Sequence, residues 1–265
     1  MMVRAIALVL LAAISQPTAE WDQWRTQRRA RLLSEDGWLT LVGLYWLHEG
    51  TNNIPPLRAQ FVLKNGHVTL LPGTPLRDDT DPKGPTIIRS GTLSYQVIKR
   101  GDVKGDRFGI RAKDTKSEAR KNFKGLDYFA FSPAFRVTAH FEPYKPPRKI
   151  AITNVLGMTS DETSPGALVF KLNGRPYQID PILEQGETDL FIIFKDATSG
   201  RETYGAARYL YAHPPDANGN TVVDFNKSYN PPCVFTPYAT CPLPPPQNRL
   251  PIRVEAGEKK YAGHA

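Results

Sequence analysis

An unbroken apolar run stands near the start of the chain. Residues 5–14 are ten consecutive apolar residues, and Arg4 precedes them. The run is too short to cross a bilayer, which needs about 20 residues. It has the length of the apolar region of a secretory signal peptide, about 7–15 residues. Cleavage is possible after Ser15 or Ala19, so the pattern predicts a signal peptide over residues 1–19 and export to the periplasm or the extracellular space. A buried N-terminal strand is the alternative.

The next stretch has the composition of a helix. Residues 20–34 contain no Gly or Pro and are rich in helix formers. We therefore expect a helix from about Trp21 to Leu33. Trp21, Trp24 and Arg28 share one helix face because they are three and four residues apart. We expect that face to dock on the body of the protein.

From residue 38 onwards the pattern is that of a β protein. Residues 38–47 form a dense apolar run that we expect to be buried. Asn-Gly pairs at 65–66 and 173–174 lie between apolar runs, and a third pair at 218–219 follows a Pro-Pro loop. Asn-Gly is a strong hairpin signal because both residues tolerate positive φ. Further apolar runs predict strands at residues 87–89, 92–99, 107–112, 135–141, 149–155, 190–194 and 203–211.

Many short strands predict a mainly β fold, an antiparallel sandwich or barrel-like core of short strands and hairpins, with one N-terminal helix after the signal peptide. The 24 prolines in 265 residues exclude a mostly helical chain. Residues 117–122 are expected to form one helical turn. The loop at 72–85 and the proline link at 143–147 are too short to force a boundary. We therefore expect residues 20–265 to form a single β-rich domain.

Positive charge is concentrated in one part of the chain. The formal net charge is +8, and loss of residues 1–19 removes only Arg4. Residues 99–124 contain ten basic and four acidic residues, an excess of +6. Such a patch can attract phosphate, acidic headgroups or envelope polymers, or can simply be a solvated surface. No nucleic-acid-binding motif is present, so nucleic acid is not an expected partner.

Two cysteines lie in a proline-rich segment near the C-terminus. Cys233 and Cys241 are the only cysteines of the chain. In an exported protein such a pair suggests a disulfide. Two free thiols, or half of a metal site, are the alternatives. A metal site needs more ligands, and the five histidines are widely spread, so we expect no metal and no cofactor.

Several motifs occur together in a fixed order. They cover residues 37–47, 123–129, 194–210, 224–233, 241–245 and 256–259. Together they resemble the prokaryotic family known as domain of unknown function 1684, from about Trp21 to Lys259. The resemblance implies one domain and no particular chemistry.

Polar residues near the C-terminus offer a candidate binding site. Asp196 opens a tight turn, and the expected strand places Tyr204 and Arg208 on one face. Tyr and Arg on a shared face suit a carboxylate or phosphate. Alternatively, Arg208 covers the sheet and pairs with Asp224. We expect Glu258 to pair with Arg208 or Arg249.

A polar turn follows the strand that ends near residue 224. Its polar residues precede a Pro-Pro pair, which favours a rigid turn bonded by side chains. The turn could frame a pocket or only satisfy backbone groups of a proline-rich loop. The candidate ligand-binding residues of the whole chain are Arg107, Arg111, Asp196, Tyr204, Arg208, Asp224, Asn226, Tyr229, Asn230 and Glu258.

Standard enzyme signatures are absent from the sequence. There is no G-x-S-x-G, H-E-x-x-H, P-loop or G-x-G-x-x-G. His140 and Glu142 would face the same way on a strand, which suits a general base with an orienting carboxylate. Asp189 with Asp196 or Asp224 is a possible carboxylate pair. No residue is assigned a catalytic role from these patterns.

The leading hypothesis is an exported binding protein of the cell envelope. Its ligand is a small or polymeric anion, held by Arg107, Arg111, Arg208 and the polar turn at 224–230. The second hypothesis is a cofactor-independent envelope hydrolase that uses carboxylates or His140. The third is a purely structural envelope protein. The mature chain is expected to have no transmembrane segment, and its oligomeric state is not predicted.

Overall fold

The structure is a computed structural model that describes residues 2–184 and 186–263, with side chains from Pro17 on. Its two α-helices are α1 (Met2–Leu33) and α2 (Glu118–Lys121). The strands are β1 (Leu41–Trp46), β2 (Gly50–Ile54), β3 (Ala59–Lys64), β4 (His67–Leu70), β5 (Thr74–Leu76), β6 (Ile88–Ser90), β7 (Leu93–Arg100), β8 (Arg107–Asp114), β9 (Arg136–Thr153), β10 (Thr159–Leu172), β11 (Arg175–Ile179), β12 (Ile182–Leu183), β13 (Leu190–Phe194), β14 (Arg208–Ala212) and β15 (Asn220–Asp224).

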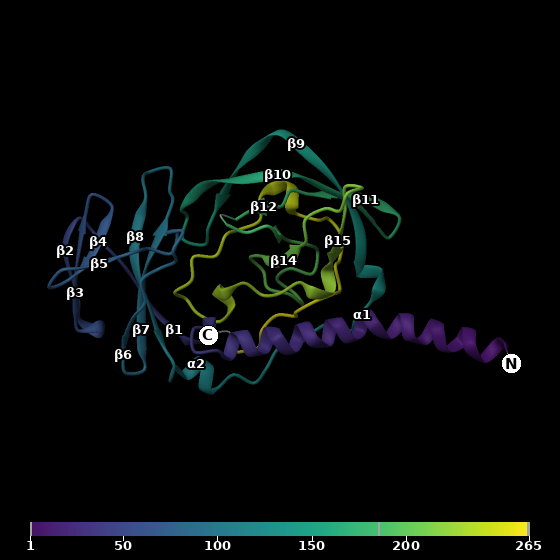
Figure 1. Ribbon diagram of the computed structural model, residues 1–265, viewed down its shortest axis with the longest axis horizontal. Helices are drawn as coiled ribbons and strands as arrows, with labels where there is room; N and C mark the ends of the chain where they lie inside the picture. The colour runs from purple at the N-terminus through teal and green to yellow at the C-terminus, as the bar shows by residue number, and fades with distance from the viewer. Residues whose placement is uncertain (1, 185, 264–265) are drawn as a thin grey trace.

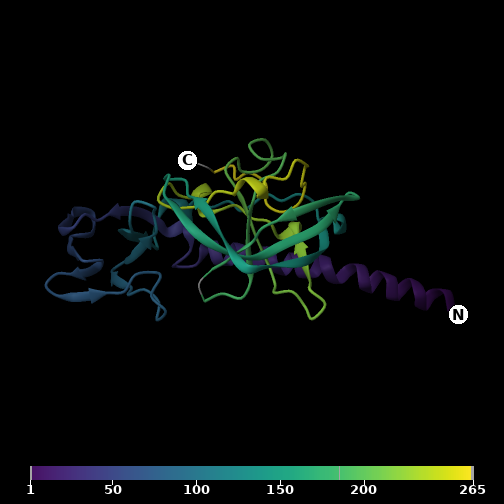
Figure 2. The same ribbon diagram turned by 90° about the horizontal axis from the view of Figure 1, so that it is seen from above.

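The strands form four sheets in two groups that lie side by side (Figures 1 and 2). The first group holds the sheets β1-β8-β7-β6 and β2-β3-β4-β5, and the second holds β11-β10-β9-β15 and β12-β13-β14. Every strand pair of these sheets is antiparallel. The expectation of a mainly antiparallel β fold with an N-terminal helix is confirmed.

Each group of sheets encloses its own apolar core. The first core contains Phe61, Val97 and Ile110, which come from the facing sheets of the first group. The second core contains Leu168 and Phe194. Strand β13 is buried on both faces: Leu190, Ile192 and Phe194 face the second core, and Phe191 and Ile193 face another apolar cluster on the opposite side.

Contacts between the groups come from loops and strand ends. The backbone N–H of Val103 donates to the carbonyl of Thr159 at 3.0 Å. Arg100 Nε donates to Thr240 Oγ1 at 2.9 Å. The ring of Trp38 packs against the apolar cluster that contains the buried Cys241.

Two of the three Asn-Gly hairpins are as expected. Asn65 and Gly66 have φ of 50° and 75°, and Asn173 and Gly174 have φ of 51° and 74°. These turns join β3 to β4 and β10 to β11. The third pair, at 218–219, makes a turn but no hairpin, because the following strand β15 pairs with β9.

The proline link predicted at 143–147 is wrong, because β9 runs through it. The register places Gly166 opposite Pro143 and Ser164 opposite Arg148, so residues 144–147 have no partner on β10. Pro146 and Pro147 have no backbone N–H to donate to a neighbouring strand. The bulge places them where no such hydrogen bond to β10 is needed.

The predicted strand at 203–211 begins too early. Strand β14 starts at Arg208, and residues 203–207 lie in a loop. The cause is a local turn in which the N–H groups of Arg201, Glu202 and Thr203 all donate to the carbonyl of Thr198. Tyr204 and Arg208 therefore do not share a strand face, which corrects the expectation from the sequence.

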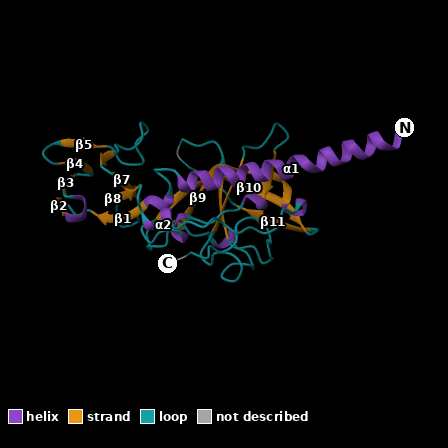
Figure 3. Cartoon of the chain, turned by 90° about the horizontal axis from the view of Figure 1, so that it is seen from below, coloured by secondary structure: helices purple, strands orange, loops and turns teal. Residues whose placement is uncertain are grey.

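Helix α1 runs along the second group of sheets, and its N-terminal half continues beyond them (Figure 3). Its predicted docking face is confirmed: Trp21 is buried and its Nε1 donates to the carbonyl of Asn226 at 3.0 Å. The helical turn at residues 117–122 is also confirmed as α2, and the Ser117 side chain accepts from the N–H of Arg120. No helix in the described part of the chain is long and apolar enough to span a membrane.

Candidate anion-binding site

The basic residues of β8 lie on one face of the strand. Phe108, Ile110 and Ala112 point into the core of the first group. Because side chains alternate along a strand, Arg107, Arg111 and Lys113 point to the opposite face. We call this row the basic face of β8.

Arg111 is a buried cation without an anionic partner. Its exposed fraction is 6%. Among the described residues its side chain has no hydrogen bond or ion pair, and its Nε is sealed from solvent without a partner. Its one described interaction is a cation–π contact with the ring of Trp38, whose centroid lies 5.1 Å from the guanidinium carbon. Burying an unpaired charge is costly, so this arrangement needs an explanation.

The surroundings of Arg111 disfavour its charged form. Burial, and then the positive charge of Arg100, lower the pKa of Arg111 to about 10, and Asp79 acts in the opposite direction. The Asp79 carboxylate is already bound to Arg100 Nη1, at 2.8 and 3.1 Å. The nearest compensating charge is therefore held by another cation.

Lys113 adds a second positive charge, which is half-buried. Burial, and then the charge of Arg111, lower the pKa of Lys113. Its Nζ donates to the backbone carbonyl of Asp36 and lies 5.9 Å from the Trp38 ring centroid. The Asp36 carboxylate instead accepts from Ser34 at 2.8 Å. Trp38 thus lies beside two cations.

At the other end of the basic face, Arg107 lies over a second tryptophan. Its guanidinium carbon is 4.3 Å from the centroid of the Trp46 ring. Gly109 makes room for this ring, since a Cβ there would lie 3.0 Å from Trp46 Cε3 and 3.1 Å from Leu44 Cδ1. A side chain at this position would press against the ring that supports Arg107.

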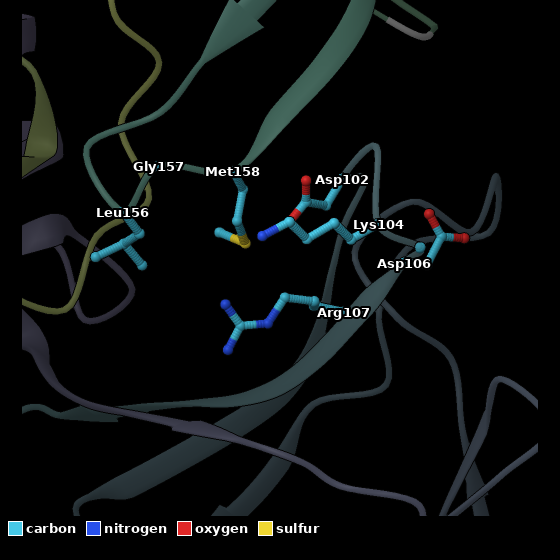
Figure 4. Close-up of a pocket in the computed structure, with 8 residues that line it drawn as sticks. Asp102, Lys104, Asp106, Arg107, Leu156, Gly157 and Met158 are labelled. Carbon is cyan, nitrogen blue, oxygen red and sulfur yellow. The ribbon is translucent and has the colours of Figure 1, made fainter.

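A pocket opens beside Arg107, between the β7–β8 turn and the β9–β10 turn (Figure 4). Its volume is about 470 Å³, and it is lined by Asp102, Lys104, Gly105, Asp106, Arg107, Leu156, Gly157 and Met158. Arg107 and Lys104 extend toward the side of Leu156 and Met158. The Asp106 carboxylate is bound to Lys99 at 2.7 Å, so it does not neutralise Arg107.

The remaining candidate residues lie elsewhere, in a polar network of the second group. Arg208 is 1% exposed and pairs with Asp196 at 3.3 Å, not with the expected Asp224. Arg208 also donates to the carbonyls of Val254 and Ala256. Asp196 accepts from the N–H of Val254 at 2.7 Å. This pair therefore fastens the C-terminal segment to β14.

Glu258 pairs with Arg28 of helix α1, not with the expected Arg208 or Arg249. The Arg28 Nε to Glu258 Oε1 distance is 2.8 Å. Glu258 Oε2 accepts from the N–H of Asn230 at 2.7 Å. The guanidinium of Arg28 also lies 4.7 Å from the Tyr229 ring centroid. Sequence reasoning placed Arg28 on a docking face but missed its carboxylate partner.

The polar turn at 224–230 is held by internal bonds. Asp224 pairs with Arg136 at 2.5 Å. The Asn226 amide donates to the carbonyl of Ser132 and to Asp224, both at 2.9 Å. Tyr204 is half-buried in an apolar cluster with Phe235. No described contact joins these residues to Arg107 or Arg111, so the structure separates the candidates into two sets.

The residues considered for catalysis contact other groups in the structure. His140 is exposed, and its Nδ1 lies 3.3 Å from Asn220 Oδ1. Asp189 contacts His213 at 3.0 Å, whereas Asp196 is bound to Arg208. Within the described residues, no group of three or more His, Cys, Asp or Glu side chains is arranged to hold a metal ion. Cys233 and Cys241 form the expected disulfide, with Cα atoms 6.2 Å apart.

Several residues of the β8 site were not among the candidate ligand-binding residues, although the two lysines belong to the basic stretch at 99–124. They are Trp38, Trp46, Lys104, Lys113, Leu156 and Met158. The alternation of Arg107, Arg111 and Lys113 along a predicted strand was the available signal for Lys113. No sequence signal pointed to the turn at 156–158, because only the tertiary fold brings this turn close to β8.

The fold and the basic face define a mainly antiparallel β protein with a cationic, tryptophan-backed surface. By sequence, the chain belongs to the family described as "Protein of unknown function (DUF1684)", whose sequence model matches residues 121–259. The resemblance noted from the motifs is thereby confirmed. The basic face of β8 precedes the matched segment, whereas the pocket wall at 156–158 lies inside it.

Among the solved structures that match, one is similar over about half of the chain. It is the solution NMR structure of an uncharacterized protein from Haloarcula marismortui, with 30% sequence identity. The similarity covers 55% of this chain and 81% of that protein, with a TM-score of 0.46. A comparison with curated proteins finds no match.

Proposed function

We propose that this protein binds an anionic ligand on the basic face of β8. The observation that carries the proposal is Arg111, a guanidinium that is 6% exposed and has no anionic or hydrogen-bonding partner among the described residues. Buried charges in proteins are ordinarily paired. A ligand carboxylate, phosphate or sulfate group would supply the missing acceptor, and a guanidinium suits such groups because it can donate two parallel hydrogen bonds.

The positive charge around Arg111 strengthens the same conclusion. The charge of Arg100 lowers the pKa of Arg111, and the charge of Arg111 lowers the pKa of Lys113, so these three cations lie near one another. In a partly desolvated site, each additional cation favours an anion more than it would in water. The Trp38 ring restricts water around the guanidinium, which strengthens its interaction with a ligand.

Inorganic phosphate provides a direct test. The melting temperature of the wild type is measured as phosphate replaces chloride at constant ionic strength, and the same titration is made with Arg111→Met. We expect phosphate to stabilise the wild type, because a ligand that binds only the folded state raises stability. The stabilisation is expected to disappear in Arg111→Met.

Lys171→Met is the matched control, since Lys171 is an exposed residue of β10 outside the basic face. It removes the same charge and should keep the full response to phosphate. An equal response in wild type and Arg111→Met would overturn the proposal.

We also propose that the protein is exported and that residues 1–19 are removed. The apolar run at 5–14 and the disulfide support this proposal. The α1 side chains that fasten the helix lie after both cleavage points: Glu20 binds Lys227, and Trp21 binds the backbone of Asn226. The intact mass of protein expressed with its full N-terminus tests this. Cleavage after Ser15 or Ala19 supports export, and an uncleaved cytoplasmic product contradicts it.

The two groups of sheets are proposed to act as one domain within residues 20–265. The contacts of Val103 with Thr159 and of Arg100 with Thr240 support this view. Limited proteolysis should then leave both groups intact together. A stable fragment of residues 121–259 alone would contradict it.

A further inference from the structure

The two walls of the pocket beside Arg107 differ in chemistry. The wall from the β7–β8 turn carries Lys104 and Arg107, and the wall from the β9–β10 turn carries Leu156 and Met158 (Figure 4). The volume of about 470 Å³ falls in the range of sites for small organic ligands, about 300–1,000 Å³. An inorganic anion alone would fill only a small part of it.

Arg107 is a cation of this pocket whose charge is available to a ligand. Its side chain has no ion pair or hydrogen bond with the described residues, and its one charge-related contact is with the Trp46 ring at 4.3 Å. Of the two acidic residues in the lining, Asp106 is bound to Lys99. Asp102 and Lys104 also line the pocket. Neither acidic residue of the lining forms an ion pair with the guanidinium of Arg107 among the described residues.

The opposite wall offers apolar surface to the same space. Leu156 is 44% exposed although it is a large aliphatic residue, and Met158 is 2% exposed. Met158 therefore forms the floor, and Leu156 forms a rim that would lose contact with water when a ligand is bound. Methionine is flexible and adapts to ligand shapes.

We propose that this pocket binds a small amphipathic anion. Its carboxylate or phosphate group binds the Arg107 guanidinium, and its aliphatic or aromatic part lies against Leu156 and Met158. This inference rests on the proposed anion-binding function and adds the chemical class of the ligand. It places the apolar part of the ligand across the junction of the two groups of sheets.

A homologous series of straight-chain carboxylates tests the inference. Binding of butanoate, hexanoate and octanoate is measured by calorimetry at pH 7.5, below the concentrations at which they form micelles. We expect affinity to rise about 2- to 4-fold per added methylene, because each methylene that leaves water favours binding. Arg107→Gln should weaken the whole series by about tenfold or more, by removal of a charged hydrogen-bond donor.

Leu156→Ser separates the apolar contribution from the charge. It should flatten the dependence on chain length and leave butanoate binding nearly unchanged. Leu183→Ser is its matched control, because Leu183 is an exposed leucine (37%) of β12 outside the pocket lining. This control should keep the chain-length dependence of the wild type. An affinity independent of chain length in the wild type, or unaffected by Arg107→Gln, would overturn the inference.

Anionic vesicles distinguish a free ligand from a membrane surface. Because the inference is that the pocket binds a free small molecule, the wild type should remain in the supernatant when sedimented with phosphatidylglycerol vesicles. Co-sedimentation that Arg107→Gln abolishes would overturn the inference in favour of a membrane. The proposed function fails separately: a phosphate response that depends on Arg111, together with a flat carboxylate series, rejects only the amphipathic ligand.

Discussion

Replacement of Arg111 by methionine should make the protein without ligand more stable. Most substitutions of a buried arginine destabilise because they break an ion pair. Arg111 has no such pair among the described residues, and its exposed fraction is 6%. Methionine retains much of the side-chain volume against Trp38 and removes the charge. The sign of the effect is therefore expected to be the reverse of the usual one.

The magnitude follows from the pKa of Arg111. Burial is the main cause that lowers its pKa from the ordinary range of a guanidinium to about 10. At about 1.4 kcal/mol per pKa unit, charging Arg111 costs the folded state about 3 kcal/mol. The folded protein holds this proton less tightly than the unfolded chain, so the cost is fully present at pH 7 and falls only as pH rises above about 10. Loss of the contact with Trp38 offsets about 1 kcal/mol.

The net gain is about 2 kcal/mol, which corresponds to a rise in melting temperature of about 4–8 °C for a chain of this size. The assay is thermal unfolding at pH 7 in low-salt buffer without phosphate or sulfate. Arg107→Met is the matched control, since Arg107 lies on the same face but is exposed. Its melting temperature should change little. An Arg111→Met protein that is less stable than the wild type would refute the reasoning that Arg111 is unpaired.

Three further predictions concern other parts of the molecule. Reduction of the Cys233–Cys241 disulfide, with its sequence separation of 8, should cost about 2.6 kcal/mol by loop entropy; calorimetry under reducing conditions checks this, and an unchanged melting temperature contradicts it. Glu258→Gln should destabilise by about 3–5 kcal/mol, because it leaves the nearly buried Arg28 without its carboxylate; urea unfolding measures the loss, and a change below about 1 kcal/mol would exclude a structural role for the pair. Burial raises the pKa of Glu184. The hydrogen bond from Tyr211 lowers it in part, and the negative charges of Glu187 and Glu162 raise it further. The charged form of Glu184 is thus unfavourable in the folded state. Glu184→Gln should therefore be more stable than the wild type at pH 8 and equally stable near pH 4, close to the ordinary glutamate pKa of about 4.3. A difference in stability that grows on acidification would contradict this.

Local patterns predicted the parts of the fold that depend on local chemistry. The hairpins at Asn65 and Asn173 form because positive φ is tolerated there, whatever the tertiary context. The path of β9 through its prolines was not predictable, because it depends on a bulge opposite Ser164 and Gly166. The false strand at 203–207 has a similar cause, since its backbone bonds are taken by the turn at Thr198.

The candidate site was only partly predictable for a related reason. The excess of basic residues identified Arg107 and Arg111, but the sequence does not show that Asp79 binds Arg100 and leaves Arg111 without a partner. Pairing depends on strand register and loop position, which are tertiary properties. The polar residues near Arg208 look equally suited to a ligand in sequence. In the fold, Asp196 and the C-terminal carbonyls accept hydrogen bonds from Nη1 and Nη2 of Arg208, and only its Nε is left without a partner among the described residues.

The central claim is that an anion binds the guanidinium of Arg111, and a crystal structure with selenate tests it most directly. Selenate has the charge and shape of sulfate, and its anomalous scattering locates it without reference to neighbouring density. The account predicts an anomalous peak within hydrogen-bond distance of the Arg111 guanidinium in the wild type, and no peak at that place in Arg111→Met. Peaks confined to exposed lysines, with Arg111 unoccupied at saturating selenate, would contradict it.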